Sequence, residues 1–214
     1  MRGRSVLRVW SGAVVVAVVL ALGAGACSDG RGEAAAPPAP PEEEGRGEVT
    51  FVSLGTDETE ANELGFPDSV RSSWNQLLFR EALPRRAVHV NLGEQGSSVA
   101  DALREQLPVA LELDPTLAGV WLTATDSEKE TSPGAYEEDL DQLVEALQQG
   151  GRTQVLLATS SGDAPAPALD AAVERVAQAR GADLVDLRDV DGPLDLDGHA
   201  AVADAFAAAL GEVR

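Results

Sequence analysis

The sequence predicts an α/β fold built on a five-stranded parallel sheet with helices on both faces. Two observations lead to this prediction. Between residues 49 and 214, five short apolar runs rich in β-branched residues alternate with five patterns of helical period. The runs are almost continuously apolar, which is typical of strands covered on both faces. Such an alternation implies parallel strands joined by right-handed crossovers.

The predicted strands place the functional loops. The five runs are "VTFVSLG" (49–55), "AVHVNLG" (87–93), "LAGVWLTATD" (117–126), "TQVLLATS" (153–160) and "ADLVDL" (182–187). In folds of this class, ligands bind beyond the carboxyl ends of the strands. We therefore expect the functional residues in the loops at Gly55, 93–98, 123–126, 160–162 and 189–199.

The first two helical patterns follow the first and second runs. The first pattern places four apolar residues on one face: Val70, Trp74, Leu77 and Leu78. The second begins near Ser98 and turns four apolar residues inward: Val99, Ala102, Leu103 and Leu107. Pro108 lacks a backbone donor and clashes with the preceding turn, so we expect it to kink or end this helix.

The third helical pattern has the clearest ends. Ser132 is a good N-cap, and Pro133 suits the first helical position. An apolar stripe follows: Leu140, Leu143, Val144 and Leu147. Gly150 and Gly151 end the helix. The fourth pattern spans about residues 169–179 and the fifth about 200–210.

The 214-residue chain is predicted to have three parts. In residues 1–27, three arginines precede an apolar run too short to span a bilayer comfortably, and small residues lead to Cys27, the only cysteine. This pattern resembles a bacterial lipoprotein signal, in which the cysteine is acylated. Residues 28–48, rich in Pro, Ala and Glu, read as a linker, and residues 49–214 as one domain. We therefore expect an anchor on the extracytoplasmic face of the cell membrane, with plain secretion as the alternative.

The charge of the chain limits its partners. The formal net charge is -20, and it falls to about -23 when the leader takes three arginines and no acidic residue with it. Such a surface repels phosphate backbones, so nucleic acid is excluded as a partner. With its only cysteine in the leader, the domain has no disulfide and no thiol chemistry.

Four segments of the domain resemble the SGNH, or GDSL, hydrolase family of esterases and lipases. They are "NLGEQGSSVADALREQLPVALELDP" (91–115), "GVWLTATD" (119–126), "SPGAYEEDLDQLVEAL" (132–147) and "GHAAVADAFAAAL" (198–210). The resemblance covers residues 49–210. It implies a flavodoxin-like three-layer fold, no cofactor, and an acylated or glycan-like ligand.

The resemblance also assigns positions in the catalytic apparatus. The family has a nucleophilic serine in a Gly-Asp-Ser turn, an oxyanion glycine in a second block, and an asparagine in a Gly-x-Asn-Asp motif. At the nucleophile position this chain has Asp57, in "GTD" after the first strand. Gly96 fits the oxyanion glycine. Thr123 and Thr125 stand at the glycine and asparagine positions, and Asp126 alone matches that motif.

The last family element is an Asp-x-x-His pair that activates the serine. Here "DGPLDLDGHAAVADAF" is shorter, and neither Asp195 nor Asp197 lies three residues before His199. The resemblance aligns His199 with the Gly-His that opens the final helix of the family, which leaves the catalytic histidine without a counterpart. The alternative makes His199 the base and either Asp195 or Asp197 its orienting group. The other histidine, His89, is interpreted as a packing or edge residue in a strand.

These substitutions favour one function and leave others open. The main hypothesis is a catalytically degenerate domain used for binding or a structural role at the cell envelope. The first alternative is an active esterase with His199 as base and a non-standard nucleophile. An Asp57 nucleophile would form an anhydride that still needs a base. The second alternative is a tethered interaction domain whose partner binds away from the cleft.

A metal site is the remaining interpretation of the acidic residues near these loops. Asp57, Glu58 and Glu60, together with Asp126 and Asp197, offer oxygen ligands for calcium or magnesium. Carboxylates meet by chance in a chain this acidic, so we assign no metal site.

Overall fold

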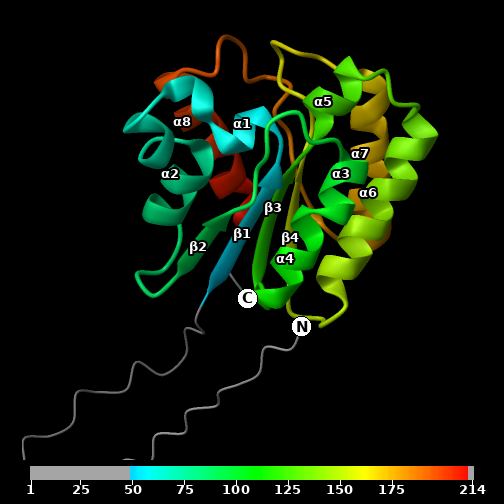
Figure 1. Cartoon of the computed structure of the whole chain (residues 1–214), viewed down its shortest axis with the longest axis horizontal. Helices are drawn as coiled ribbons and strands as arrows, with labels where there is room; N and C mark the ends of the chain where they lie inside the picture. Colours follow the sequence, from blue (N-terminus) through cyan, green and yellow to red (C-terminus); the bar gives the residue numbers. More distant parts are fainter. Residues whose placement is uncertain (1–48, 212–214) are drawn as a thin grey trace, which may run out of the picture. The chain divides into compact units, whose positions relative to one another are not determined.

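The computed structural model describes residues 49–211, and the predicted leader, Cys27 and linker lie outside them (Figure 1). Five strands form one parallel sheet in the order β2-β1-β3-β4-β5. The strands are β1 (Thr50–Gly55), β2 (Val88–Asn91), β3 (Leu117–Trp121), β4 (Gln154–Ala158) and β5 (Asp183–Val185). The predicted α/β class and five-stranded parallel sheet are confirmed.

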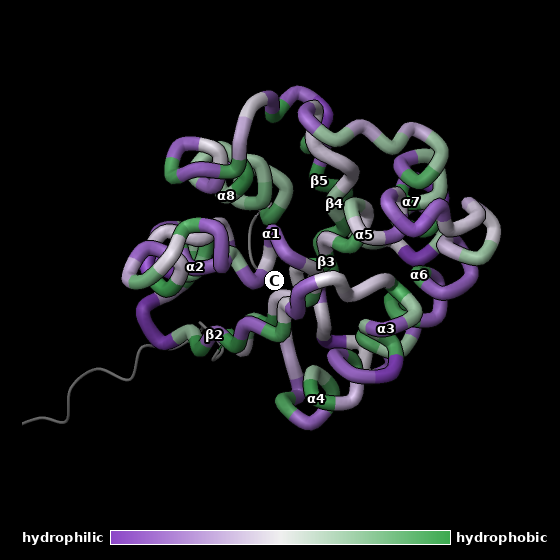
Figure 2. Tube along the Cα trace, turned by 45° about the horizontal axis from the view of Figure 1, so that its top comes forward, coloured by the Kyte–Doolittle hydropathy of each residue, from purple (hydrophilic) through white to green (hydrophobic). Residues whose placement is uncertain are grey.

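Helices cover both faces of the sheet. The helices are α1 (Asp57–Glu60), α2 (Trp74–Glu81), α3 (Val99–Arg104), α4 (Gln106–Glu112), α5 (Thr123–Glu128), α6 (Pro133–Gln148), α7 (Pro167–Arg180) and α8 (Leu196–Leu210). Two 3₁₀ turns, η1 (Asn62–Leu64) and η2 (Asp68–Val70), lie between α1 and α2. Helices α2 and α8 lie on one side of the strands, and α3, α4, α6 and α7 on the other (Figures 1 and 2). Within residues 49–211, no helix combines the length and the apolar character that a membrane crossing requires.

Alternating side chains of the strands make two hydrophobic cores. In β1, Val52 and Leu54 join the core under α3, α6 and α7, whereas Phe51 points to the core under α2 and α8. In β4, Val155 and Leu156 divide in the same way. Because successive strand residues face opposite sides, a nearly continuous apolar strand feeds both layers at once.

The third strand is shorter than the sequence predicts. The apolar run to Asp126 was expected to be one strand, but β3 ends at Trp121, and Thr123–Glu128 form α5. The pairing of β3 with β1 ends at Gly55 opposite Trp121, because the chain beyond Gly55 leaves the sheet. Without a neighbour to continue the ladder, the segment after Trp121 satisfies its backbone groups as a helix.

Two helices also differ from the prediction. Val70 lies in η2 with 56% of its surface exposed, and α2 begins only at Trp74, after the extended residue Ser73. Pro108 ends no helix. The helix is instead interrupted at Glu105. Pro108 lies in the first turn of α4, where a backbone N–H has no acceptor within the helix, so proline costs no hydrogen bond there. The third and fourth helices form as predicted, and Ser132 caps α6.

The second predicted strand is not covered on both faces. Strand β2 lies at the edge of the sheet, pairs only with β1, and leaves Val88 about half exposed. His89 is a packing residue, as expected: its ring stacks on Phe51, with a distance of 4.7 Å between the ring centroids. Its nitrogens lie 3.1 Å from the Ser53 hydroxyl and 3.2 Å from the Gln76 side-chain nitrogen.

The burial of His89 predicts a loss of stability in acid. Burial lowers the pKa of His89 from 6.5 to about 4 in the folded protein. Between these values the unfolded chain binds the additional proton, so this contribution is complete above about pH 6.5 and is lost as the pH falls towards 4. We expect the loss to reach about 3 kcal/mol of unfolding free energy.

Urea unfolding at neutral and acidic pH measures this effect. His89→Gln keeps a polar side chain that does not titrate, so its unfolding free energy should fall less with pH than that of the wild type. Equal falls in both proteins would show that His89 is not the group responsible.

Candidate functional site

The turn after β1 is built around Gly55. A Cβ at this position would lie 1.9 Å from the Thr59 hydroxyl oxygen and 2.8 Å from the Trp121 carbonyl oxygen, so only glycine fits. The buried Gln106 amide binds both backbone groups of Gly55: Oε1 accepts the N–H at 3.0 Å, and Nε2 donates to the carbonyl at 2.8 Å. This support places Asp57 at the start of α1, beyond the carboxyl end of β1.

The carboxylate of Asp57 accepts a hydrogen bond from Gly96, the residue that the resemblance aligns with the oxyanion glycine. The backbone N–H of Gly96 donates to Asp57 Oδ2 at 2.8 Å. The neighbouring N–H of Gln95 donates to Glu60 Oε2 at 3.0 Å. Two consecutive amides of the loop are therefore bound by carboxylates of α1. The geometry thus brings Asp57 and Gly96 into direct contact.

The environment of Asp57 favours its ionised form. Partial burial acts to raise the pKa of Asp57, but hydrogen bonds from the Gly96 N–H and the side chains of Thr56 and Gln95 outweigh it, so the pKa is lowered. An oxygen of an ionised carboxylate thus lies against the Gly96 N–H. This is the kind of oxygen that an oxyanion donor stabilises during acyl transfer.

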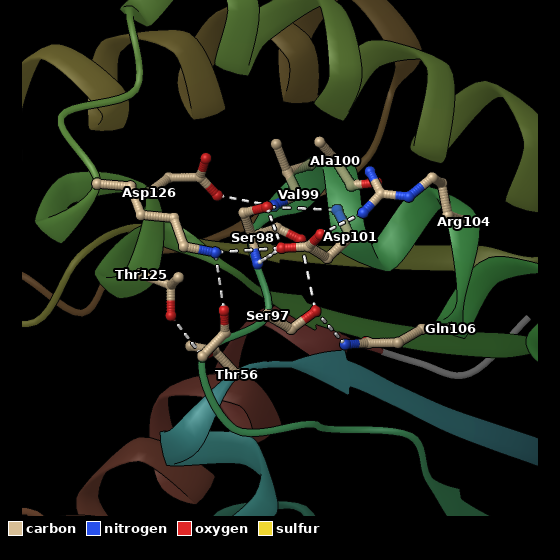
Figure 3. Close-up of polar contacts among 12 residues, drawn as sticks. Thr56, Ser97, Ser98, Val99, Ala100, Asp101, Arg104, Gln106, Thr125 and Asp126 are labelled. Atoms are coloured by element: carbon tan, nitrogen blue, oxygen red, sulfur yellow. Dashed lines mark hydrogen bonds and ion pairs between the residues drawn. The ribbon is translucent and has the colours of Figure 1, made fainter.

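Thr125, at the asparagine position, is also occupied by a contact within the protein (Figure 3). Its hydroxyl lies 2.6 Å from the Thr56 hydroxyl, and both residues are buried. The Thr56 hydroxyl donates to Asp57 Oδ2 at 2.9 Å, so the Thr125 hydroxyl is the donor in the contact with Thr56. The chain of donors runs from Thr125 through Thr56 to Asp57.

The loop that carries Gly96 is held from the following helix (Figure 3). Ser98 and Asp101 form a capping box at the start of α3, which confirms the predicted helix start near Ser98. Lys129 donates to the Gly96 carbonyl at 3.0 Å and to Asp101 at 3.2 Å. The buried Asp126 accepts the Val99 N–H at 2.7 Å. Asp126, the one residue that matches the third motif, is thus a structural acceptor.

His199 lies inside the protein, within α8, and none of its surface is exposed. Its Nδ1 accepts the backbone N–H of Trp74 at 3.2 Å, and its Nε2 lies 2.8 Å from Glu63 Oε1. Because Nδ1 is an acceptor, Nε2 carries the proton and donates it to Glu63. Neither nitrogen is free to take a proton from a nucleophile. Its place inside the final helix agrees with the alignment to the family Gly-His.

Asp195 lies at the N-terminus of α8. Its carboxylate accepts the N–H groups of Asp197 and Gly198, both at 3.1 Å. This cap explains why α8 begins at Leu196, four residues before the predicted start. The carboxylate that was considered as an orienting group for His199 serves the backbone of the helix.

Sequence reasoning missed one residue of the pocket, Leu194. Leu194 lines the same pocket as Asp57, and Asp191 precedes it by three residues. The segment Asp191–Leu194 therefore has the spacing of the Asp-x-x-His pair, with leucine in place of histidine. Counting three residues from each aspartate of the loop, Asp191 included, would have found it.

A pocket of about 360 Å³ lies beside the nucleophile turn. Its lining is mainly acidic and comes from α1, η1 and two loops: Asp57, Glu58, Glu60, Asn62, Glu63, Gln95 and Leu194. Within residues 49–211, no three His, Cys, Asp or Glu side chains are arranged to hold a metal ion.

Comparisons with known proteins address the family and the fold. The model of the GDSL-like lipase/acylhydrolase family matches residues 55–207. No curated protein matches the chain.

Several solved structures share the fold. LAE5, an α/β hydrolase enzyme from the metagenome of Lake Arreo, Spain, is 22% identical with a TM-score of 0.59, over 78% of this chain and 96% of its own. The psychrotrophic esterase EstA from Pseudoalteromonas sp. is 16% identical with a TM-score of 0.61, over 76% and 97%. The acetyl xylan esterase AlAXEase is 15% identical with a TM-score of 0.62, over 76% and 100%.

Proposed function

The chain belongs to the GDSL-like lipase/acylhydrolase family, and from this premise we propose that it binds a ligand in the acidic pocket without hydrolysing it. One observation carries the proposal. The oxyanion donor, the Gly96 N–H, is bound by the Asp57 carboxylate, which stands where the family has its nucleophilic serine. An ester carbonyl would have to displace a charged hydrogen bond to reach this donor.

The lack of a histidine base among the described residues of the site supports the same proposal. Leu194, at the last position of an Asp-x-x-His spacing, offers no base, and both nitrogens of His199 are bound within the protein. In serine hydrolases, removing the nucleophile or the base costs a factor of about 10⁶ in kcat. Restoring the serine alone would therefore not restore the reaction.

We further propose that the domain acts at the extracytoplasmic face of the cell membrane, tethered through acylated Cys27 and the linker 28–48. This part of the proposal rests on the sequence pattern of residues 1–48. Mass spectrometry of the membrane-associated protein tests it. A diacylglyceryl group on Cys27 is the expected finding, and an unmodified Cys27 in a secreted chain would overturn the anchor.

Hydrolysis of p-nitrophenyl acetate by the purified full chain tests the proposed loss of catalysis. We expect no rate above buffer for the wild type or for Asp57→Ser, with EstA as the positive control. Asp57→Ser is the sharper test because it supplies the nucleophile and frees the Gly96 N–H, while Leu194, which cannot act as a base, still lines the pocket. A wild-type rate that Asp57→Ala abolishes would show that Asp57 takes part in catalysis and would overturn the proposal.

A further inference from the structure

The two edges of the sheet are protected to different degrees. Strand β5 forms one edge, and it carries Asp183 within the strand and Asp186 directly after it. Strand β2 forms the other edge, and its residues include neither an acidic or basic residue nor a proline. Charged residues and prolines are two means by which proteins keep the edge of a sheet from pairing with another chain. The edge at β2 lacks both within the strand.

Strand β2 presents backbone groups to the outside of the sheet. The N–H groups of Val88 and Leu92 donate to carbonyl oxygens on the β1 side, at 2.8 and 2.9 Å. Because alternate residues of a strand direct their backbone groups to opposite sides, His89 and Asn91 direct theirs away from β1. Within residues 49–211, no strand pairs with this outer side of β2 (Figure 1). These groups can therefore pair with an added strand.

An apolar stripe follows one face of the same edge. Val88, Val90 and Leu92 share this face, because successive side chains of a strand alternate between its two faces. Val88 is 49% exposed, and Val90 and Leu92 are half-buried. An added strand with apolar side chains on this face would cover the stripe.

The edge is complementary to a second copy of itself. In an antiparallel pair, two opposite residues can exchange both of their N–H···O=C bonds. Placing His89 opposite Asn91 of the second copy, and Asn91 opposite its His89, uses every outward backbone group of β2. The same register places Val90 opposite Val90 on the two-fold axis and Val88 opposite Leu92, so the two apolar stripes also meet.

The charges at the ends of β2 match in this register. Arg86 precedes the strand and Glu94 follows it, and both are exposed. Their spacing from β2 places Arg86 of each copy opposite Glu94 of the other. The Glu94 N–H donates to the Gly55 carbonyl at 3.2 Å, so the chain continues along β1 as far as Glu94. Within residues 49–211, neither Arg86 nor Glu94 forms an ion pair. Opposite charges across antiparallel strands stabilise the pairing, and like charges destabilise it.

We propose that the β2 edge joins two copies of this chain into a symmetric dimer, with the two β2 strands antiparallel and the sheet continuous across the two-fold axis. A two-fold interface uses the same surface of both copies, which requires a self-complementary surface such as this edge. An unrelated extended peptide would meet the outward backbone groups, but nothing would match its charges to Arg86 and Glu94. The association does not depend on the proposed function.

Sedimentation velocity of the purified full chain, over a series of concentrations, tests the inference. We expect a reversible equilibrium between monomer and dimer. Val88→Lys places a charge in the apolar stripe twice in each dimer, so we expect it to weaken the association about tenfold. Ala168→Lys is the control: it adds a positive charge to an exposed position of α7, which packs against α6, β4 and β5, and it should change the association by less than about twofold.

An exchange of charges tests the register. Arg86→Glu places two acids opposite each other, and Glu94→Arg places two arginines opposite each other. We expect each substitution to weaken the association about tenfold, although the two change the net charge in opposite directions. The double variant Arg86→Glu/Glu94→Arg restores opposite charges and should associate within about twofold of the wild type.

Three results would overturn the inference. The first is a chain that stays monomeric at every concentration, which would leave the edge to a different protein. The second is an equal effect of Val88→Lys and Ala168→Lys, which would mean that the contact does not lie at β2. The third is a double variant that associates no better than either single variant, which would exclude the antiparallel register.

Discussion

Replacing His199 by alanine is expected to lower the free energy of unfolding by roughly 3–5 kcal/mol. The side chain is completely buried, and its Nδ1 is the acceptor for the Trp74 N–H at the start of α2. Truncation therefore leaves a cavity and an unpaired backbone donor, and each has a cost. Chemical unfolding, followed by the fluorescence of the buried tryptophans, measures the loss.

Glu63→Gln is the matched control for this substitution. It keeps an oxygen that can accept from His199 Nε2, and the Glu63 side chain is 41% exposed, so we expect a loss below about 1 kcal/mol. If His199→Ala lowered the free energy of unfolding only slightly, the packing of α8 against α2 would not depend on this residue. A large loss of unfolding free energy would show that His199 stabilises the fold.

Gly55→Ala is expected to cost roughly 3 kcal/mol or more. The added Cβ would lie 2.5 Å from the Thr59 Cβ and 2.8 Å from the Trp121 carbonyl oxygen. These atoms belong to α1 and to the end of β3, so the clash can be relieved only by moving α1 or by spreading the sheet. Because α1 supplies Asp57, Glu58 and Glu60 to the pocket, the substitution should also distort the pocket.

Gly134→Ala provides the control for an added methyl group. Gly134 lies in the first turn of α6, and a Cβ there meets no heavy atom within 4 Å. We expect this substitution to be neutral or to stabilise the protein by up to about 1 kcal/mol, since alanine is the better helix former. If both variants had the same urea midpoint, the close approach at Gly55 would not be a constraint.

The two substitutions address one feature of this molecule. Parts that serve acyl transfer in the family, the Gly55 turn and the final helix, here hold the structure together through buried contacts. Gln106 clamps Gly55, and His199 joins α8 to the start of α2. These contacts stabilise the fold whichever residues occupy the nucleophile and base positions.

The fold was predictable because its signals are local. Apolar runs alternate with helical periods, and caps such as Ser98 and Ser132 mark where helices begin. The prediction was wrong where the tertiary neighbours decide. The segment after Trp121 has a strand-like sequence, but it finds no strand to pair with once the chain leaves the sheet at Gly55.

The site was predictable only in part. The family resemblance put Asp57 and Gly96 at two positions of one site, and in the structure the Gly96 N–H donates to the Asp57 carboxylate. Leu194 was missed because leucine has no reactive or hydrogen-bonding group that would mark it as a site residue in the sequence. Its position became visible when the structure placed it in the pocket that also contains Asp57.

The sequence by itself determined the sheet, its order of elements along the chain, and the residue types at the family positions. Only the tertiary structure decided what those residues do. The Gly96 N–H, the Thr125 hydroxyl and His199 Nδ1 are bound by groups 39, 69 and 125 residues away in the chain. A hydrogen bond requires a donor and an acceptor within about 3 Å and in line, and no local pattern in the sequence specifies such a meeting. The chain shows which groups are present, and the folded structure determines which of them remain free to act on a ligand.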